Sequence, residues 1–395
     1  MISVGIDVSK GKSTCIMKPC GEILESPFDI GHTADELDSL ISLIKSFDEE
    51  TRVVMEDTGH YHLPVATYLS SHNIFVCCVN ALRMKKFCSQ SIRRAKTDKI
   101  DSIKIASFGI TYWNELVKAY PSNVIYDELK FLARQYYQVT GMLVKSKVNF
   151  SNLLDQVMPK INDVLSNQGE NHKLTEFVSR YIHFQNILDM GEMKFTSDYC
   201  KWAKKKGYRL NERKAAEILA LAQNGIPTLP NSQSVKIAVS EAVKLIHSIE
   251  ESRNTILAQM QDLCNTLPEY SVVKEMDCIG DTLAPRIIAE IGDVRRFKNK
   301  HSLIAYAGID APPYQSGAFH ASERHISKRG NSYLRKTGYE IMQSLIKHKP
   351  ADNAVYDFIQ KKRSEGKCGK EAMIAGLNKF LRVYYGKVME FYSEH

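Results

Sequence analysis

Four carboxylates in the first hundred residues are spaced in a way that suits metal-ion chemistry. Asp98 and Asp101 lie three residues apart in a strongly basic stretch, RRAKTDKIDSIKIA. On one helix face such a pair of like charges is destabilising by roughly 0.2–0.5 kcal/mol unless a cation lies between them. The two others belong to runs of strand-forming residues: Asp7 in VGIDVSK and Glu56 at the end of TRVVME. These residues are called the four acids below.

The four acids are expected to converge, because groups at the carboxyl ends of neighbouring strands in an open α/β sheet meet in one crevice. Four carboxylates there would repel one another unless divalent cations lay among them. Two Mg²⁺ ions about 4 Å apart are the usual device for in-line displacement at phosphorus. Each acid alone is more often structural, but their order across strand, strand and helix is more specific. We therefore predict a site for two Mg²⁺ ions.

Strand and helix patterns alternate along the segment that must position these acids. The predicted strands are MISVGIDVS, KSTCIMKP, TRVVME and NIFVCCVN, and the predicted helices are TADELDSLISLIKSF and YHLPVATYLSSH. This alternation is typical of an α/β domain with a partly parallel sheet, which we assign to residues 1–115.

Long helical patterns replace the strands from Pro121 onward. Residues 126–159 fit one helix of about thirty residues, and residues 234–268 fit a second, so an antiparallel coiled-coil arm is predicted within residues 120–268. The stretch between the two helices, residues 160–230, is predicted to be mainly helical.

A basic segment, KWAKKKGYRLNERK, lies within this helical stretch. Seven of its fourteen residues are basic, and Trp202 and Tyr208 are interleaved with them. Such a segment can bind the backbone of a nucleic acid through Lys204, Lys205 and Lys206 and stack its aromatic rings on bases. A plain solvated helix is the alternative.

The composition is that of an ordinary globular protein. The 395 residues include 44% apolar and 25% charged residues, and 53 basic against 45 acidic side chains give a net charge of +8. The nine cysteines are scattered without metal-ligand spacing, and no apolar run is long enough to span a membrane. We expect a cytoplasmic protein with two or three domains and no membrane contact.

The last part of the chain, residues 269–395, is predicted to be a mainly α-helical domain. CIGDTLAPRIIAEIGD has a glycine turn on each side of a helical run, as in a helix-hairpin-helix that binds phosphate, although a plain helical hairpin fits equally well. PPYQSGAFH is a loop that presents Ser316. The basic residues expected to contact phosphates are Arg324, Lys328, Arg329, Arg335 and Lys336.

Several of these motifs resemble one family. GIDVSK, VVMEDTGHY and KTDKID are similar to the three amino-terminal blocks of the DEDD transposases of insertion sequence family 110, the 110/116/902 group, to which the pilin-gene invertases are related. Residues 276–336 resemble the carboxyl-terminal transposase domain of that family. The resemblance implies a RuvC-like, ribonuclease-H fold for residues 1–115. Residues 160–230 look like an insertion relative to shorter members.

The resemblance also implies a mechanism. The four acids would bind Mg²⁺, and a serine would attack a DNA phosphodiester to form a covalent phosphoserine. The family places this serine ten residues before the ISKRGN block, which selects Ser316 over Ser322 and Ser327. Activation of its hydroxyl by His320, by His325 or by a metal-polarised water remains open.

The partners that the resemblance implies are target and donor DNA, a structured bridge RNA from the same mobile element, and a second subunit. A dimer joined by the long helices would assemble into a tetramer on DNA. The closest alternative is a site-specific DNA invertase, since it shares the same residues. A Holliday-junction resolvase leaves residues 270–340 unexplained, a sugar kinase lacks its glycine-rich loops, and a non-catalytic DNA-binding protein has no need of four acids.

Overall fold

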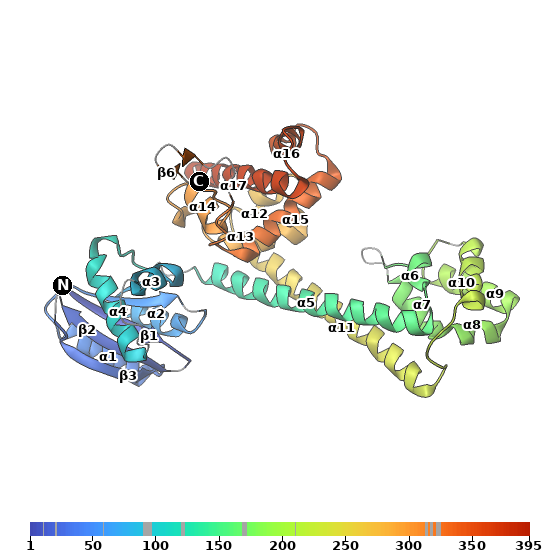
Figure 1. The fold of residues 1–395 in the computed structure, drawn as a ribbon, viewed down its shortest axis with the longest axis horizontal. Helices are drawn as coiled ribbons and strands as arrows, with labels where there is room; N and C mark the ends of the chain where they lie inside the picture. Colours follow the sequence, from blue (N-terminus) through green and yellow to red (C-terminus); the bar gives the residue numbers. More distant parts are fainter. Residues whose placement is uncertain are drawn as a thin grey trace. The chain divides into compact units, whose positions relative to one another are not determined.

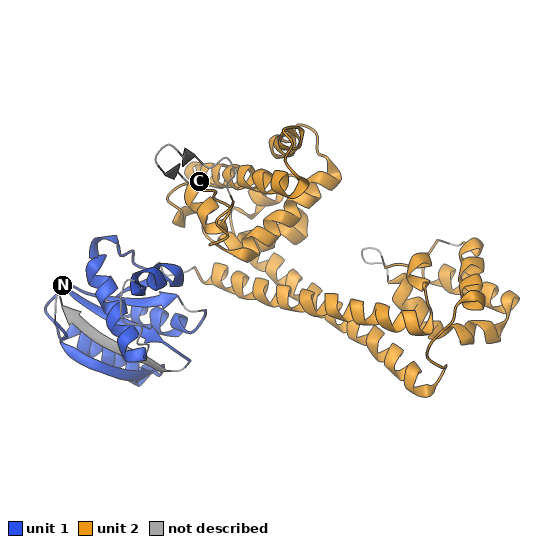
Figure 2. Cartoon of the chain, in the orientation of Figure 1, with its two compact units in different colours: residues 1–122 blue, residues 123–395 orange. Residues whose placement is uncertain are grey.

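The computed structural model divides the chain into two compact units, residues 1–122 and residues 123–395 (Figure 2). It describes all residues except 11, 20–21, 58, 90–96, 120–122, 168–171, 210, 313–314, 317–318 and 321–324, and for 12–19, 315–316 and 319–320 it describes the backbone alone. Within the described part of the chain, no helix is both long and apolar enough to cross a membrane.

The first unit is built on a five-stranded sheet in the order β3-β2-β1-β4-β5. The central strand β1 pairs antiparallel with β2 and parallel with β4, while β2 pairs antiparallel with β3 and β4 pairs parallel with β5. The strands are β1 (Ile2–Val8), β2 (Lys12–Pro19), β3 (Glu25–Gly31), β4 (Thr51–Asp57) and β5 (Phe75–Asn80).

The sequence patterns predicted four of these strands and missed β3. This strand lies at the edge of the sheet, and Ile30 is its one buried residue. An edge strand needs little apolar alternation and tolerates a proline such as Pro27, so it lacks the pattern by which the others are recognised.

Helices cover both faces of the sheet (Figure 1). On one face, Val4 and Ile6 share a core with Leu40 and Val65 of the helices α1 and α2, and on the other face Val54 packs with residues of α3 and α4. Because successive residues of a strand point to opposite faces, the even-numbered residues of β1 face α1 and α2. The helices are α1 (Ala34–Lys45), α2 (His62–Ser71), α3 (Ala81–Cys88), α4 (Asp98–Thr111) and the short η1 (Trp113–Glu115).

The second unit is organised by two long helices, α5 (Val124–Val157) and α11 (Gln233–Asn265). Leu129 near the start of α5 shares a core with Met260 near the end of α11, and Phe150 near the end of α5 shares another with Val243 near the start of α11. The two helices therefore pack side by side in opposite directions.

The second of these cores belongs to a small helical bundle. Its helices bury large aromatic side chains, including Phe177, Phe195 and Tyr199, against the far ends of α5 and α11. They are α6 (Ile161–Val164), α7 (Lys173–Tyr181), α8 (Phe184–Met190), α9 (Glu192–Lys205) and α10 (Glu212–Asn224). The predicted insertion of residues 160–230 is thus mainly helical.

The remaining helices pack around the first part of α5. A side chain at Gly338 would collide with Leu377, and one at Gly376 with Ile359, so these glycines allow α15, α16 and α17 to approach closely. The elements are α12 (Tyr270–Lys274), α13 (Gly280–Ile291), η2 (Val294–Arg296), α14 (Lys300–Ala307), β6 (Gln315–Ser316), β7 (Phe319–His320), α15 (Ser332–His348), α16 (Ala354–Ser364) and α17 (Gly369–Glu394).

Candidate functional site

Asp7 and Glu56 lie at the carboxyl ends of adjacent parallel strands. The register of β1 and β4 pairs Ile6 with Met55, so that Asp7 and Glu56 come next on their strands. Ile6 and Met55 are buried in the core under α1 and α2. Since side chains alternate between the two faces of a sheet, Asp7 and Glu56 belong to the opposite face, which α4 covers.

The helix α4 runs along β1 so that its first turn lies at this same end of the sheet. A side chain at Gly109, near the end of α4, would collide with Ser3, and one at Gly5 would collide with the backbone of Ser102. Residues nearer the carboxyl end of β1 therefore lie beside residues nearer the start of α4. The carboxyl end of β1 accordingly lies beside residues 98–101, the first turn of α4.

The start of α4 is fixed by a capping residue. Oγ1 of Thr97 accepts a hydrogen bond from the N–H of Ile100 at 3.2 Å. Thr97 is therefore the N-cap of α4, which begins at Asp98. Asp98 is exposed, whereas Asp101 is half-buried and forms an ion pair with Lys104 Nζ at 3.2 Å. Lys104 was not predicted as part of this site, although its i, i+3 spacing from Asp101 was a usable signal.

The pKa of the Cys88 thiol supports the proximity of Glu56 and Asp101. Burial raises the pKa of Cys88, the positive charge of Lys104 opposes that rise, and the carboxylates of Asp101 and Glu56 add to it. One thiol therefore lies within the electrostatic influence of acids from both β4 and α4.

The donor chemistry of this corner fits a hard divalent cation, because carboxylate oxygens are the ligands that Mg²⁺ prefers. Among the described residues, no three His, Cys, Asp or Glu side chains already lie close enough together to hold a metal ion. Asp7 and Glu56 each make polar contacts of their own, and Asp101 is paired with Lys104.

Asp57 follows Glu56 directly but belongs to the other face of the sheet. Its exposed carboxylate lies 3.6 Å from Nε2 of His62, a buried residue of α2. Alternation along β4 thus separates two adjacent acids, and only Glu56 faces α4.

Ser316 lies in a short two-stranded ladder of the second unit. Its backbone, in β6, pairs antiparallel with Phe319 of β7, and Gln315 pairs with His320. The side chains of Ser316 and His320, and the whole of Ser322 and Arg324, lie outside the described residues.

The two ends of the segment that carries Ser316 are held together. The N–H of Ser327 donates to the carbonyl of Asp310 at 2.8 Å, and its hydroxyl donates to the Asp310 carboxylate at 2.5 Å. One step further out, the N–H of Lys328 donates to the carbonyl of Gly308 at 2.9 Å. Ser327 therefore has a structural role at the base of the segment.

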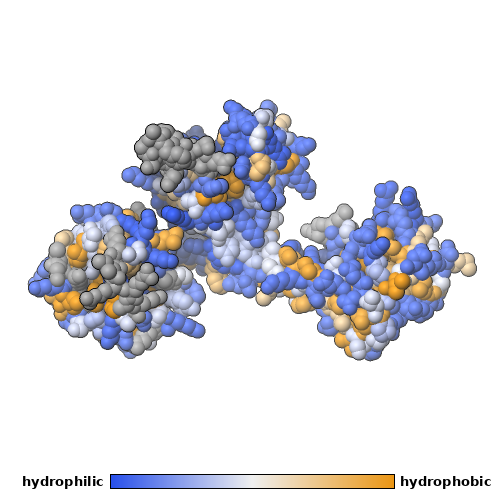
Figure 3. All heavy atoms as spheres, viewed as in Figure 1, coloured by the Kyte–Doolittle hydropathy of each residue, from blue (hydrophilic) through white to orange (hydrophobic). Residues whose placement is uncertain are grey.

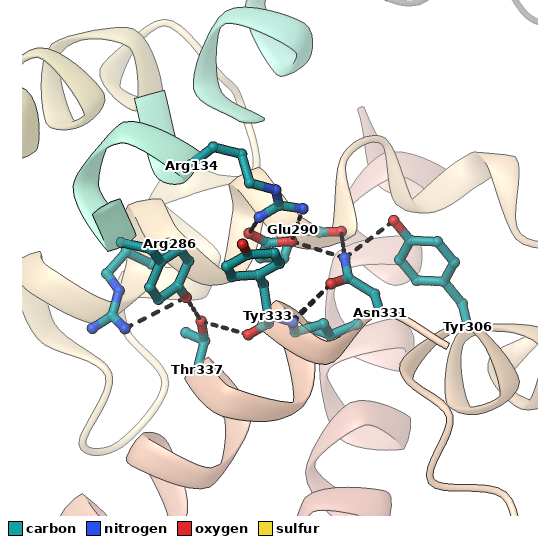
Figure 4. A network of polar contacts seen from close by, with 9 residues as sticks. Arg134, Arg286, Glu290, Tyr306, Asn331, Tyr333 and Thr337 are labelled. Atoms are coloured by element: carbon teal, nitrogen blue, oxygen red, sulfur yellow. Dashed lines mark hydrogen bonds and ion pairs between the residues drawn. The ribbon is translucent and has the colours of Figure 1, made fainter. Parts of the chain in front are cut away.

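A buried carboxylate, Glu290 of α13, ties this base to the long helix α5 (Figure 4). It accepts two hydrogen bonds from Arg134 of α5, one of them 3.1 Å long, and another from Asn331 Nδ2 at 2.8 Å. The side-chain oxygen of Asn331 in turn accepts the N–H of Tyr333 at 3.0 Å and starts α15. This network was not predicted from the sequence, in which a lone glutamate within the apolar run IIAEI is its one signal.

Two protein-family models match the chain. The DEDD model of the IS110 type, described as a transposase, matches residues 4–159, and the model described as the transposase IS116/IS110/IS902 family matches residues 270–357. Together they span more than half of the chain. The chain belongs to the IS110 family of transposases.

Relatives and a solved structure are similar to this IS110-family chain. The IS110 insertion element protein of Streptomyces coelicolor is 22% identical over 299 residues, 76% of this chain and 72% of that protein. The pilin gene-inverting protein of Moraxella bovis is 26% identical over 136 residues, 33% of this chain and 42% of that protein. T. thermophilus RuvC in complex with a Holliday junction substrate matches 29% of this chain and 96% of its own, at 10% identity and a TM-score of 0.23.

As an IS110-family transposase, the protein is an enzyme that binds DNA and cleaves and rejoins its strands. The DEDD domain also implies a divalent metal ion. The strand order of the first unit and the DEDD match both fit the predicted RuvC-like fold.

The basic residues of the second transposase domain have different surroundings. Lys328, Arg329 and Lys336 are exposed, as phosphate-contacting residues must be. Arg335 is half-buried, and its Nη1 donates to the carbonyls of Ala307 at 2.9 Å and of Gly330 at 3.1 Å. Arg335 thus braces the end of α14 against the turn before α15, so its guanidinium has a structural role that the sequence did not suggest.

The aromatic residues of the basic segment do not face solvent as the stacking interpretation requires. Trp202 is 7% exposed and belongs to the core of the helical bundle. The hydroxyl of Tyr208 and Nζ of Lys206 each donate to Glu176 at 3.0 Å. The interpretation that Trp202 stacks on bases is therefore wrong, because helical periodicity turns it inward, while the lysines at 204–206 are exposed.

The predicted glycine turns flank α13. Gly280 has φ +57° and Gly292 has φ +66°, conformations that favour glycine. Inside α13, Pro285 cannot donate a hydrogen bond to the carbonyl of Asp281, and Gln261 Nε2 from α11 donates to that carbonyl at 2.9 Å instead. This contact anchors α13 on the long helix α11.

Proposed function

We propose that this transposase cuts and rejoins DNA in a Mg²⁺-dependent reaction that passes through a phosphoserine on Ser316. The observation that carries the proposal is that Asp7, Glu56 and the first turn of α4 belong to one end and one face of the sheet. There the four acids would hold Mg²⁺, and the register of β1 and β4 determines where Asp7 and Glu56 lie. When bound, the ion would neutralise charge that develops on the phosphoryl oxygens.

Ser316 would supply the nucleophile. Its Oγ forms a bond to the phosphorus of a DNA phosphodiester, the bond from phosphorus to one deoxyribose oxygen breaks, and that strand leaves as a free hydroxyl. The Oγ proton passes to a general base, for which His320 and His325 are both candidates, and the protonated base then gives a proton to the leaving deoxyribose oxygen. A hydroxyl of the exchanged strand then attacks the phosphoserine, restoring a phosphodiester and regenerating Ser316 without any external energy source.

The acids and the serine lie in different units, so the reaction needs a composite site. We propose that it forms between subunits of a dimer, which pairs further into a tetramer on DNA, as the family resemblance implies. Large apolar side chains exposed on the long helices support a second copy of this chain as the partner: Val144 is 58% exposed and Val148 57% on α5, and Leu245 is 53% exposed on α11. Hydrophobic side chains are visible along these helices in Figure 3.

We also propose that a bridge RNA from the element guides the enzyme to target and donor DNA. The support for RNA is the family resemblance together with exposed cations that suit a phosphate backbone, among them the lysines at 204–206 and Lys328.

A DNA invertase is the second candidate, favoured by the similarity to the pilin gene-inverting protein. It would use the same residues and the same chemistry. The genomic surroundings distinguish the two functions, because a transposase gene lies in a mobile element and an invertase gene lies beside an invertible segment.

The decisive experiment looks for a protein–DNA adduct that survives denaturation when the full-length protein, its RNA and its DNA are mixed with Mg²⁺. We expect the adduct with the wild type and none with Ser316→Ala, because that change removes the oxygen that carries the DNA. Ser327→Ala loses a hydrogen bond to Asp310 but keeps the adduct, and so does Ser322→Ala. Persistence of the adduct without Ser316 would refute the phosphoserine and point to direct attack by water or a DNA hydroxyl.

A further inference from the structure

A groove of about 970 Å³ runs along one side of α17 in the second unit. Ala311 and His325, which flank the segment that carries Ser316, line one part of it, and residues of α16, of α17 and of the turn between them line most of the rest. The groove thus begins beside the ends of the serine segment, the residues between Asp310 and Ser327, and continues along α17.

Positive charge dominates this groove. Four of its lining residues are cationic, Lys367, Lys370, Lys379 and Arg382, and Glu371 is its one carboxylate among the described lining residues. In the described part of the chain, none of the four cations forms an ion pair with a carboxylate, and Arg382 donates only to the amide oxygen of Asn378, at 3.0 Å. Cations gathered without counter-charges repel one another, so a polyanion bound there relieves that repulsion.

The floor of the groove is apolar and includes an aromatic ring. Ile374 and Ala375 line it together with half-buried Phe358, and Lys379 Nζ lies 5.1 Å from the centre of the Phe358 ring. A cationic rim over an apolar and aromatic floor suits a single nucleic-acid strand, whose phosphates meet the cations while sugars and bases cover the floor. A duplex would present phosphates alone.

The length of the cationic row agrees with this ligand. Lys370 and Arg382 are twelve residues apart on α17, which is about 18 Å along a helix. This distance spans several nucleotides of one strand, within the range of about 4–16 nucleotides that single-strand sites cover. We propose that the groove holds a single strand of substrate DNA as it leads to or from Ser316. This inference rests on the proposed function, since the serine segment makes DNA the expected strand here.

The test compares two charge-matched triple variants of the full-length protein. One replaces Lys370, Lys379 and Arg382 by Gln. The control replaces three exposed lysines outside the groove by Gln, Lys347, Lys361 and Lys387. The affinity for a short fluorescein-labelled single-stranded DNA is measured as a function of salt concentration.

The groove variant should bind more weakly and lower the slope of log affinity against log salt by about two, the value for three lost contacts to a single strand. The control should keep the wild-type slope. Glu371→Gln, which removes the groove carboxylate, should tighten binding several-fold, a gain that misfolding cannot produce. An unchanged slope in the groove variant, or an equal loss in the control, overturns the proposal.

Two further arms identify the ligand and separate this inference from the mechanism. A DNA duplex should lose less affinity than the DNA strand, because its paired bases cannot cover the apolar floor. An equal loss with the duplex would refute the single-strand assignment, and a loss confined to an RNA strand of the same sequence would refute the DNA assignment. Ser316→Ala should retain the wild-type slope, because it changes no charge. A failed groove test with an intact Ser316-dependent adduct would therefore reject the groove alone.

Discussion

The two regions that the proposed reaction requires are built in opposite ways. The acids of the first unit stand on regular elements, at the ends of β1 and β4 and in the capped first turn of α4, so the register of a sheet determines where they lie. Ser316 lies in the short β6–β7 ladder, within a segment whose two ends are joined by the hydrogen bond between Ser327 and Asp310. The buried carboxylate of Glu290 binds Asn331 and so fixes the start of α15, the next helix.

This difference matches what each region must do. A metal site tolerates little displacement of its ligands, since the ion requires a defined number of oxygens at defined distances. A nucleophile that carries a DNA strand between two partners instead needs a segment that is anchored at both ends and is accessible to DNA at the nucleophile. We therefore expect changes at the acids to abolish chemistry outright, and changes behind the serine segment to act through stability.

The largest effect should come from the acids. Asp7→Asn, Glu56→Gln or Asp101→Asn preserves the side-chain volume but removes a charged metal ligand, so recombination should fall by at least about 10³-fold in a plasmid assay. DNA binding measured by gel shift should change little, because the basic surface supplies the affinity.

Asp57→Asn provides the matched control, because Asp57 adjoins Glu56 on β4 but lies on the other face of the sheet beside His62. It should recombine like the wild type. Full activity in any two variants of the acids, or loss of activity in Asp57→Asn, would contradict the assignment of the metal site to the α4 face.

An intermediate effect is expected at the network behind the serine segment. Glu290→Gln removes the charge that compensates Arg134, and breaking a buried pair of this kind costs about 2–3 kcal/mol, a value lowered because Arg134 is partly exposed. Urea unfolding followed by far-ultraviolet circular dichroism reports mainly on the second unit, which contains most of the helices.

Glu365→Gln, whose carboxylate pairs with Lys362 at the surface, should leave that transition unchanged. A variant at Glu290 that unfolds like the wild type would mean that the network does not support the second unit, and the contrast between the two regions would lose its energetic basis.

The elements that carry the four acids were easier to predict from the sequence than the contacts around the segment that carries Ser316. Strand alternation and helix spacing are local, so Asp7, Glu56 and Asp98 could be placed on elements from short patterns. Glu290 and Arg134 meet across 156 residues of chain, and no local pattern signals such a contact. The edge strand β3 was missed because exposure on one side removes its alternation, and Trp202 was misjudged because a charged stretch can still turn one residue inward at helical spacing.

The smallest effect should come from the lysines at 204–206, far from either region of the proposed chemistry in sequence. Replacing all three by Gln should lower the salt slope for binding to duplex DNA by about two rather than three, because Lys206 already pairs with Glu176 at 3.0 Å. RNA that co-purifies with the wild type, extracted and sequenced, should decrease in amount in this variant, whereas the triple variant of Lys347, Lys361 and Lys387 should retain it. Since Trp202 is buried, no loss of stacking adds to the effect, and an unchanged slope would show that these lysines form only a solvated end of α9.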